Sequence, residues 1–259
     1  MIANTFDDTT NSKINPKLGE DRVKCDACIV TFSNIIEQYI NEKYNPEIVG
    51  YIKMVNGDIP IYLLDVNNKK IAVYKTILTS DASVACFEDS REIIDTNKYI
   101  VFGGSGCLNK DIARGKLMIP TEAYRDEGVS YHYAPAADYI TMKNSDKVAE
   151  FMESKNIPYA LGKTWTISTF YRETEGKIEK RKEEGCIAVE MECSALQAVC
   201  DYRDVELFYF LSSGDLLDAP EWDKRIVDEN DYKGTQHDSR LFDIALELAD
   251  YLTNKKTIS

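Results

Sequence analysis

The sequence predicts a single α/β domain whose central sheet is mixed but mostly parallel and is flanked by helices. Short apolar runs alternate along the chain with segments of helical periodicity, which is typical of strands joined by covering helices. The length of 259 residues suits one such domain as well as two smaller ones, but no repeat, low-complexity block or Pro/Gly linker divides the chain. We expect an N-terminal arm over residues 1–20 and the folded domain over residues 21–259.

The charge balance and the cysteines limit the classes of partner. A net charge of −13 speaks against a nucleic-acid or membrane surface, because both attract basic patches. No apolar run approaches the length of a membrane span, and no secretory signal pattern is present. Cys25 and Cys28 have C-x-x-C spacing, but no second pair or nearby histidine completes a zinc site. We therefore expect a cytoplasmic protein without a metal, a nucleic-acid partner or a membrane partner.

The first hundred residues are expected to begin with a buried strand at residues 26–31. Ser33 and Asn34 then provide the N-cap of a helix. Turn signals such as Asn56-Gly57 separate the next three apolar runs and favour antiparallel pairing. These three strands are expected at residues 48–54, 59–64 and 70–77, with a helix at 84–94.

In the second half, a strand at residues 98–102 is expected to lead into a glycine-rich loop at 103–106. A long loop is expected at residues 121–137, and long loops in compact domains are usually functional. The remaining expected strands lie at 117–120 and 159–167, and the expected helices at 145–155, 172–184 and 238–253.

Residues 185–218 organise the rest of the chain. A short apolar strand at residues 187–189 meets the acidic turn Glu190-Met191-Glu192, which opens a helix. A second apolar run at residues 205–211 stops at Ser-Ser-Gly-Asp, ending in Asp215. Ligands in open α/β sheets collect where strands end and helices begin, so two acids lie at candidate positions.

Each acid has a structural and a functional interpretation. Glu192 shares a helix face with Ala195, Leu196 and Val199, so it is expected to point inward, where a lone carboxylate is costly. A half-exposed first-turn glutamate, stabilised by the helix dipole, is the alternative. Asp215 suits a turn or an N-cap as well as a catalytic site.

Two further segments are candidates for ligand contacts. Gly104 and Ser105 lie in a run of small residues that lets backbone N–H groups approach a ligand, although a plain tight turn gives the same pattern. Arg125 and His132 lie in the expected long loop, and a satisfied structural role for His132 is at least as well supported as a role in the site.

Five segments, in order, resemble the nucleoside phosphorylase family, which includes purine nucleoside phosphorylases, uridine phosphorylases and nucleosidases. Residues 189–195, VEMECSA, resemble its V-E-M-E-x-x-A motif, and residues 210–216, FLSSGDL, resemble its strand ending in S-D. The other three are VFGGSGCL at 101–108, SYHYAP at 130–135 and TISTFY at 166–171. The resemblance covers roughly residues 26–252 and implies the phosphorylase/hydrolase-like fold.

The resemblance also implies roles in breaking the bond between ribose C1′ and a base nitrogen. Glu192 is expected to accept hydrogen bonds from the ribose hydroxyls, Met191 to pack under the sugar and Phe170 to stack on the base. Asp215 is expected to donate a proton to a purine ring nitrogen. The remaining expected substrate-binding residues are Glu190, Gly104, Ser105, Arg125 and His132. No cofactor is expected, inorganic phosphate being the co-substrate.

The resemblance favours a purine over uracil as the base. Uridine phosphorylases carry an arginine where this chain has Asp215, and a glutamine and an arginine where it has Thr174 and Gly176. Neither Thr174 nor Gly176 can clamp a uracil edge. The segment SYHYAP, seen in uridine phosphorylase-like members, favours the opposite assignment.

The chain departs from the family at the expected phosphate site. Residues 31–34, TFSN, replace a G-D-P-x-R loop, and Val101 replaces an arginine. Arg91, Arg125 and Lys163 are candidate replacements. Phosphorolysis is the preferred reaction, while hydrolysis and nucleoside binding without turnover stay open. The resemblance also implies a homodimer or a dimer-based hexamer.

Overall fold

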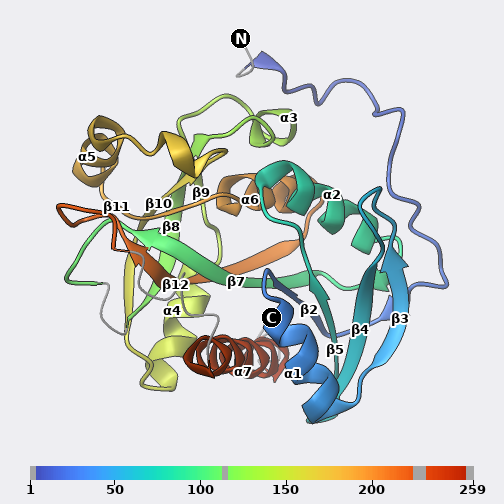
Figure 1. The fold of residues 1–259 in the computed structure, drawn as a ribbon. Coiled ribbons are helices and arrows are strands. Elements are labelled where there is room, and N and C mark those ends of the chain that lie inside the picture. Colours follow the sequence, from blue (N-terminus) through green and yellow to red (C-terminus); the bar gives the residue numbers. More distant parts are fainter. Residues whose placement is uncertain (1–3, 113–115, 224–231, 255–259) are drawn as a thin grey trace.

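The computed structural model describes residues 4–112, 116–223 and 232–254 (Figure 1). Its centre is a ten-stranded sheet. The strand order is β11 (Cys186–Glu190), β10 (Tyr159–Ile167), β8 (Leu117–Asp126), β12 (Glu206–Leu216), β7 (Lys98–Cys107), β2 (Ala27–Thr31), β5 (Lys69–Lys75), β4 (Ile59–Val66) and β3 (Glu47–Ile52). The tenth strand, β9 (Tyr139–Thr141), pairs with β8.

The sheet is mixed, as predicted. Parallel pairing joins β5, β2, β7 and β12, and also joins β8, β10 and β11. Antiparallel contacts connect β12 to β8 and β11 to β7. The five strands β11, β10, β8, β12 and β7 therefore form a closed ring, in which β11 pairs with β7. The remaining strands, β3, β4 and β5, pair antiparallel, as the turn signals predicted.

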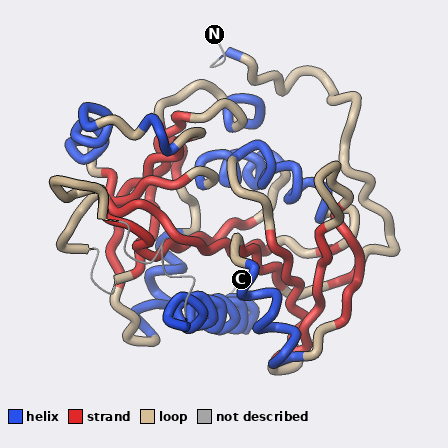
Figure 2. Tube along the Cα trace, in the orientation of Figure 1, coloured by secondary structure: helices blue, strands red, loops and turns tan. Residues whose placement is uncertain are grey.

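Helices cover both faces of the sheet, and Figure 2 shows the sheet between two helical layers. One layer contains α2 (Ser80–Ser90), α3 (Ser130–Tyr133) and α6 (Cys193–Tyr202). The other contains α1 (Asn34–Tyr44), α4 (Ser145–Ser154) and α7 (Tyr232–Asn254). Each layer has its own buried apolar cluster against the sheet. The predicted α/β class with flanking helices is therefore confirmed.

Two expected strand ends are wrong, and both errors concern the candidate site. Residues 103–106 are part of β7 rather than a loop, and β12 continues through Asp215. The reason is mutual pairing, because Ser212 lies opposite Gly104 and Leu216 opposite Cys107. A ladder of backbone hydrogen bonds thus holds glycine and serine residues that have low intrinsic strand propensity.

Two other expected boundaries are also wrong. Residues 121–126, at the start of the expected long loop, belong to β8. This strand reaches Asp126 because β10 pairs with it up to Ile167. The helix expected at residues 84–94 is α2, which begins at Ser80. By contrast, α1 begins as predicted, since the hydroxyl of N-cap Ser33 accepts a hydrogen bond from Ile35 N.

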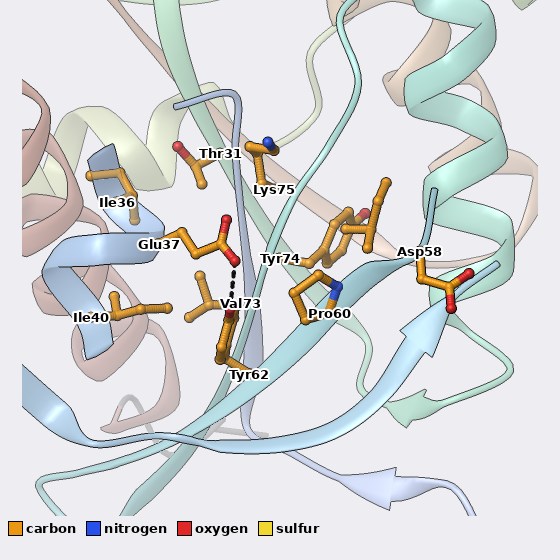
Figure 3. A pocket seen from close by; sticks show the side chains of 11 residues that line it. Thr31, Ile36, Glu37, Ile40, Asp58, Pro60, Tyr62, Val73, Tyr74 and Lys75 are labelled. Carbon is orange, nitrogen blue, oxygen red and sulfur yellow. Dashed lines mark hydrogen bonds between the residues drawn. The ribbon is translucent and has the colours of Figure 1, made fainter. Parts of the chain in front are cut away.

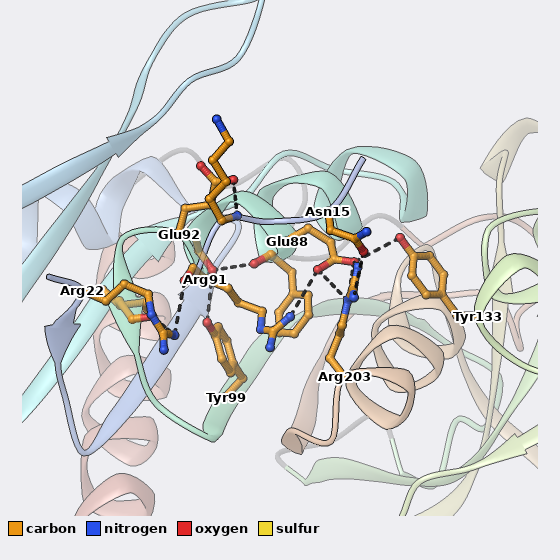
Figure 4. Close-up of polar contacts among 12 residues, drawn as sticks. Asn15, Arg22, Glu88, Arg91, Glu92, Tyr99, Tyr133 and Arg203 are labelled. Atoms are coloured by element: carbon orange, nitrogen blue, oxygen red, sulfur yellow. Dashed lines mark hydrogen bonds and ion pairs between the residues drawn. The ribbon is translucent and has the colours of Figure 1, made fainter. Parts of the chain in front are cut away.

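The N-terminal arm reaches the domain at a polar cluster between α2 and α6 (Figure 4). The guanidinium of Arg203 binds the carboxylate of Glu88 at 2.7 Å, and Nη1 of Arg203 lies 3.4 Å from Asn15 Oδ1. Arg91 Nη1 also pairs with Glu88, at 3.5 Å. Near the arm, β1 (Val23–Lys24) pairs with β6 (Ile94–Asp95) in a separate two-stranded sheet.

No described helix combines the length and the apolar character needed to cross a lipid bilayer.

The closure of β11 on β7 depends on a glycine, which gives a stability prediction. A Cβ at Gly106 would lie 2.7 Å from Val189 Cγ1 and 2.8 Å from Leu217 Cδ1. We expect Gly106→Ala to lower the free energy of unfolding by roughly 1–3 kcal/mol, because Val189 is β-branched and cannot rotate away.

Gly104→Ala is the matched control, because a Cβ there meets no atom within 4 Å. Its unfolding free energy should stay within roughly 0.5 kcal/mol of wild type in urea denaturation. Equal losses in the two variants would contradict the packing argument.

Candidate active site

A short stretch of β7 has a strand neighbour on only one side. β2 pairs with β7 up to Val101, and β11 pairs with it from Gly106 onward. Between these points no described strand pairs with β7 on that side, although β12 pairs with it on the other. We call this stretch, residues 102–105, the β7 slot. Gly104 in the slot is exposed and has open space where a side chain would be. Backbone groups in the slot are therefore available to a ligand.

The register of β7 places the two predicted acidic segments at this slot. β11 reaches Glu190 one residue after Val189, which lies opposite Gly106. Asp215 of β12 also lies opposite Gly106, on the other side of β7. Its Oδ1 is 3.4 Å from the position that a Cβ of Gly106 would occupy. Segments far apart in the sequence thus meet through one strand.

Glu190 is satisfied by the protein itself. Its Oε2 accepts hydrogen bonds from Glu192 N at 2.7 Å and Cys193 N at 2.6 Å, and Oε1 accepts one from Thr166 Oγ1 at 2.6 Å. The first N–H groups of α6 would otherwise lack partners. The geometry gives Glu190 the role of a helix cap, and its predicted contact with substrate stays a prediction.

Glu192 occupies the N-cap position of α6 and is only 4% exposed. Its Oε1 accepts a hydrogen bond from Thr79 N at 2.6 Å, while Ser80 Oγ donates to Met191 O at 2.6 Å. The inward orientation predicted from the helix face is confirmed. Thr79 and Ser80, at the start of α2, fix the Met191-Glu192 segment.

The backbone of Thr79 is strained. Its φ is 86° and its ψ is 151°, a conformation that β-branched residues rarely adopt. The strain directs the Thr79 N–H at the Glu192 carboxylate. The sequence did not indicate this contact, because nothing in the local pattern points to a positive φ at Thr79.

The two glutamates titrate unusually. Burial, and then the charge of Glu190, raise the pKa of Glu192 from its ordinary value of 4.5 to about 8. Burial raises the pKa of Glu190 to about 7, against the hydrogen bonds from Thr166 and from backbone N–H groups. Two buried carboxylates close together therefore resist simultaneous ionisation.

Asp215 has two neighbours that the sequence did not indicate. Trp222 Nε1 donates a hydrogen bond to Asp215 Oδ2 at 2.6 Å. Burial raises the pKa of Asp215, and this hydrogen bond opposes the shift. Burial, and then the charge of Asp215, raise the pKa of Glu173 from 4.5 to about 7. Glu173 and Asp215 thus form a second pair of carboxyl groups with raised pKa values.

The aromatic side chain predicted to stack on a base is exposed. Phe170 lies in the short 3₁₀ helix η2 (Phe170–Arg172), three residues after β10 ends, and 48% of its surface is accessible. The strand that precedes it, β10, is the neighbour of β11 in the sheet, and Thr166 of β10 lies opposite Glu190 of β11. The ring centroid of Phe170 is 4.3 Å from that of Tyr171. Stacking on a ligand stays a prediction.

Ser105 is buried, and its hydroxyl donates to Ser212 O at 3.2 Å. This bond crosses from β7 to β12 and supports the strand pair. Contact of Ser105 and Gly104 with a ligand stays a prediction, and the open space at Gly104 leaves room for one.

Arg125 is buried within its own loop. Its Nε donates to Ser130 Oγ at 2.8 Å, and its Nη groups donate to the carbonyls of Ala134, Pro135 and Ala137. These contacts give Arg125 a structural role in holding residues 127–137. His132 is exposed in α3 and lines a groove beside the N-terminal arm with Thr5, separate from Glu192 and Asp215.

The cations proposed to replace the missing arginines are engaged elsewhere. Arg91 pairs with Glu88 in the cluster of Figure 4, and Lys163 pairs with Glu122 at 2.8 Å. A cation that sequence reasoning missed is Lys75, which ends β5 opposite Thr31 of β2. Lys75 lies within the strand expected at residues 70–77, and its place directly after the apolar residues 71–74 was the available signal.

Lys75 lines a cavity of about 160 Å³ at the carboxyl ends of β2 and β5 (Figure 3). Its ammonium group donates a hydrogen bond to the side chain of Asn34. Glu37 also lines the cavity, and its Oε1 accepts a hydrogen bond from the Tyr62 hydroxyl at 2.6 Å. A cation, a carboxylate and the Thr31 side chain therefore lie where β2 leads into α1.

A family model described as the phosphorylase superfamily matches residues 40–249. The chain belongs to the phosphorylase superfamily. Two similar members are DeoD-type purine nucleoside phosphorylases. The Bacillus velezensis protein is 26% identical over 61% of this chain and 68% of its own length. The Alkaliphilus metalliredigens protein is 26% identical over 70% of this chain and 71% of its own.

The fold agrees with this membership. The crystal structure of Toxoplasma gondii purine nucleoside phosphorylase with immucillin-H matches 97% of this chain and 100% of its own, with a TM-score of 0.73 and 15% identity. That likeness concerns the fold alone. The predicted family is thereby confirmed, and the chain is placed among phosphorylase-superfamily enzymes.

No group of three or more His, Cys, Asp or Glu residues with metal-binding geometry occurs in the described parts of the chain. The seven cysteines are unpaired thiols, and Cys28 is fully buried. The expectation that the protein needs no cofactor stays a prediction.

The raised pKa of Glu192 predicts how stability depends on pH. The folded protein retains a proton on Glu192 that the unfolded chain releases above pH 4.5, so the free energy of unfolding should fall as pH rises from 4.5 to about 8. Glu192→Gln should remove part of this fall and stabilise the protein above pH 8 by roughly 1–3 kcal/mol.

Urea unfolding at a series of pH values measures this dependence. Glu179→Gln, which changes an exposed carboxylate on α5 (Glu175–Glu183), is the control and should keep the wild-type slope. An identical slope in wild type and Glu192→Gln would contradict the argument.

Proposed function

We propose that this protein cleaves the N-glycosidic bond of a purine nucleoside, with phosphate as the acceptor of the ribosyl group. The observation that carries the proposal is the slot of β7, with the buried Glu192 beside one end and Asp215 across the strand. Membership of the phosphorylase superfamily supports this use of the slot.

In this proposal Glu192 binds the ribose. A ribose carries two neighbouring hydroxyl donors, and an ionised carboxylate can accept from both. Thr79 N holds one oxygen of Glu192 in place, which fixes the orientation of the sugar. Binding of the hydroxyls favours the ionised carboxylate and therefore lowers a pKa that burial has raised.

Asp215 is the proposed general acid. The departing base gathers negative charge, and a proton delivered to its ring nitrogen makes it a better leaving group. A carboxyl group can do this near neutral pH only if its pKa is raised, and burial shifts the pKa of Asp215 in that direction. A purine supplies a suitable ring nitrogen, and Phe170 provides an exposed aromatic face nearby in sheet order.

Phosphate would bind at the β7 slot beside Gly104, where backbone N–H groups can approach an anion. Lys75, at the end of β5, is the proposed cation in place of the family's arginines. A second candidate reaction is hydrolysis, which Glu37 favours, since a carboxylate in the cavity of Figure 3 could accept a proton from an attacking water.

Product analysis by chromatography tests the reaction. Purified protein is incubated with inosine, adenosine, guanosine and uridine, each with and without phosphate. We expect release of a purine base and ribose 1-phosphate only when phosphate is present. Free ribose without phosphate would replace phosphorolysis by hydrolysis. Binding of nucleosides without release of base would contradict both reactions and identify a binding protein.

Both acids are expected to be essential. Asp215→Asn and Glu192→Gln should each lower kcat/KM by about a hundredfold or more, since each removes a group used in the transition state. Asp218→Asn is the control, because Asp218 binds Lys110 N at 3.1 Å and the Lys182 ammonium outside the slot. Near-wild-type rates in either acid variant would refute its assignment.

The hydrogen bond from Trp222 predicts a shift in the pH profile. This bond lowers the pKa of Asp215, so Trp222→Phe should raise it. Because the protonated acid is the active form, the alkaline limb of kcat/KM should move to higher pH. A limb that stays in place or moves to lower pH would show that Asp215 does not govern it.

We also propose that the protein assembles as a homodimer or a dimer-based hexamer, by analogy with its superfamily. Light scattering at micromolar concentration measures the mass, and a monomer would refute the proposal.

A further inference from the structure

A second cavity lies beside α7, between that helix, β12 and the segments that lead into β8 and β10. Its volume is about 240 Å³, which is room for several water molecules or a small anion. Ser213 of β12 contributes to one wall, and His237 and Arg240 of α7 contribute to another. Lys116, just before β8, also lines it. Glu192, Asp215 and the other residues of the β7 slot do not.

Two residues that line this cavity each carry a buried polar atom without a hydrogen-bond partner. The atoms are Ser213 Oγ and His237 Nε2. An unsatisfied buried polar group costs about 1–3 kcal/mol, and such groups are few in folded proteins. Two such atoms on residues that line one cavity indicate that a group outside the protein chain completes their hydrogen bonds.

The titratable side chains that line the cavity are two cations, Lys116 and Arg240, and one histidine. Arg240 and Lys116 are exposed, and neither forms an ion pair or hydrogen bond with another described residue. No Asp or Glu is among the described residues that line the walls. In a chain with a net charge of −13, two unpaired cations at one cavity stand out.

Apolar side chains form the rest of the wall. Leu241 and Ile244 of α7 and Leu117 of β8 are buried there.

We propose that this cavity is a binding site for a phosphate-type oxyanion, separate from the nucleoside site. A hydroxyl, a guanidinium and an ammonium group all donate hydrogen bonds, and an imidazole donates from Nε2 when that atom is protonated. The ligand that suits four donors is an anion with several acceptor oxygens. Inorganic phosphate and the phosphate group of a small phosphate ester share this chemistry.

Ser213 links this site to the β7 slot. Ser213 lies opposite Ser105, and the β12–β7 register shifts between Ser213 and Asp215. The adjoining Ser212 O accepts the hydrogen bond of Ser105 Oγ. An anion held by Ser213 therefore fixes the segment of β12 that carries Asp215. This inference does not require the proposed reaction, because binding is measured without turnover.

Calorimetric titration of the full chain with inorganic phosphate, at constant ionic strength set with chloride, tests the site. Arg240→Ala should weaken binding about tenfold, since it removes one charge-assisted partner. Arg240→Glu should abolish the binding event at this cavity and leave the one proposed at the β7 slot. His237→Gln retains an N–H donor and should weaken binding less than His237→Ala does. Glycerol 3-phosphate, titrated in the same way, distinguishes a phosphate ester from free phosphate as the preferred ligand.

Lys155→Glu is the matched control. Lys155 pairs with Glu247 of α7 at 2.7 Å but does not line this cavity, so reversal of its charge should leave phosphate affinity unchanged. Equal losses in Lys155→Glu and Arg240→Glu would reduce the effect to net charge and overturn the proposal. Phosphate binding that is unchanged in Arg240→Glu and lost entirely in Ser105→Ala would place all of the bound anion in the β7 slot and also overturn the proposal.

Discussion

The change of partner along β7 is the constraint on which the site depends. β2 leaves β7 at Val101 and β11 joins it at Gly106, and the residues between them keep a partner only in β12. Such a change requires glycine, because Val189 and Leu217 occupy the space beside Gly106. A side chain there would separate β11 from β7. The slot, the closure of the five strands and the position of the acidic turn are therefore consequences of one local packing arrangement.

Burial and charge have opposite effects on the acidic turn. Oε2 of Glu190 accepts hydrogen bonds from the first N–H groups of α6 and Oε1 accepts one from Thr166, which holds the carboxyl group of Glu190 close to Glu192. Thr79 offers Glu192 a single backbone N–H in return, and does so in a strained conformation. Glu192 thus has fewer hydrogen-bond partners in the protein than Glu190 and a higher pKa. A carboxylate that binds the hydroxyl groups of a ligand is expected to have these two properties in the free protein.

The sequence predicted the class of fold, the strand at residues 159–167 and the inward orientation of Glu192, because each depends on local periodicity. It failed where pairing decides the structure: Gly103–Gly106 have turn composition, yet β12 holds them in a strand. The partners of Asp215 were also missed, since Trp222 and Glu173 reach it through tertiary contacts that no spacing encodes. Arg125 was a reasonable candidate by residue type, but only the structure shows that carbonyl groups of its own loop surround it.

Closure of the sheet at one end has a consequence for association between chains. β11 has neighbours in both β10 and β7, so it presents no free backbone edge over its paired length. The opposite end of the strand order is β3, which among the described strands pairs only with β4 and carries Ile48 and Tyr51 with 43% and 45% of their surfaces exposed. An edge strand with apolar side chains is a template for edge-to-edge pairing. Growth of this sheet by another copy is therefore directed to β3, at the end of the strand order opposite β11.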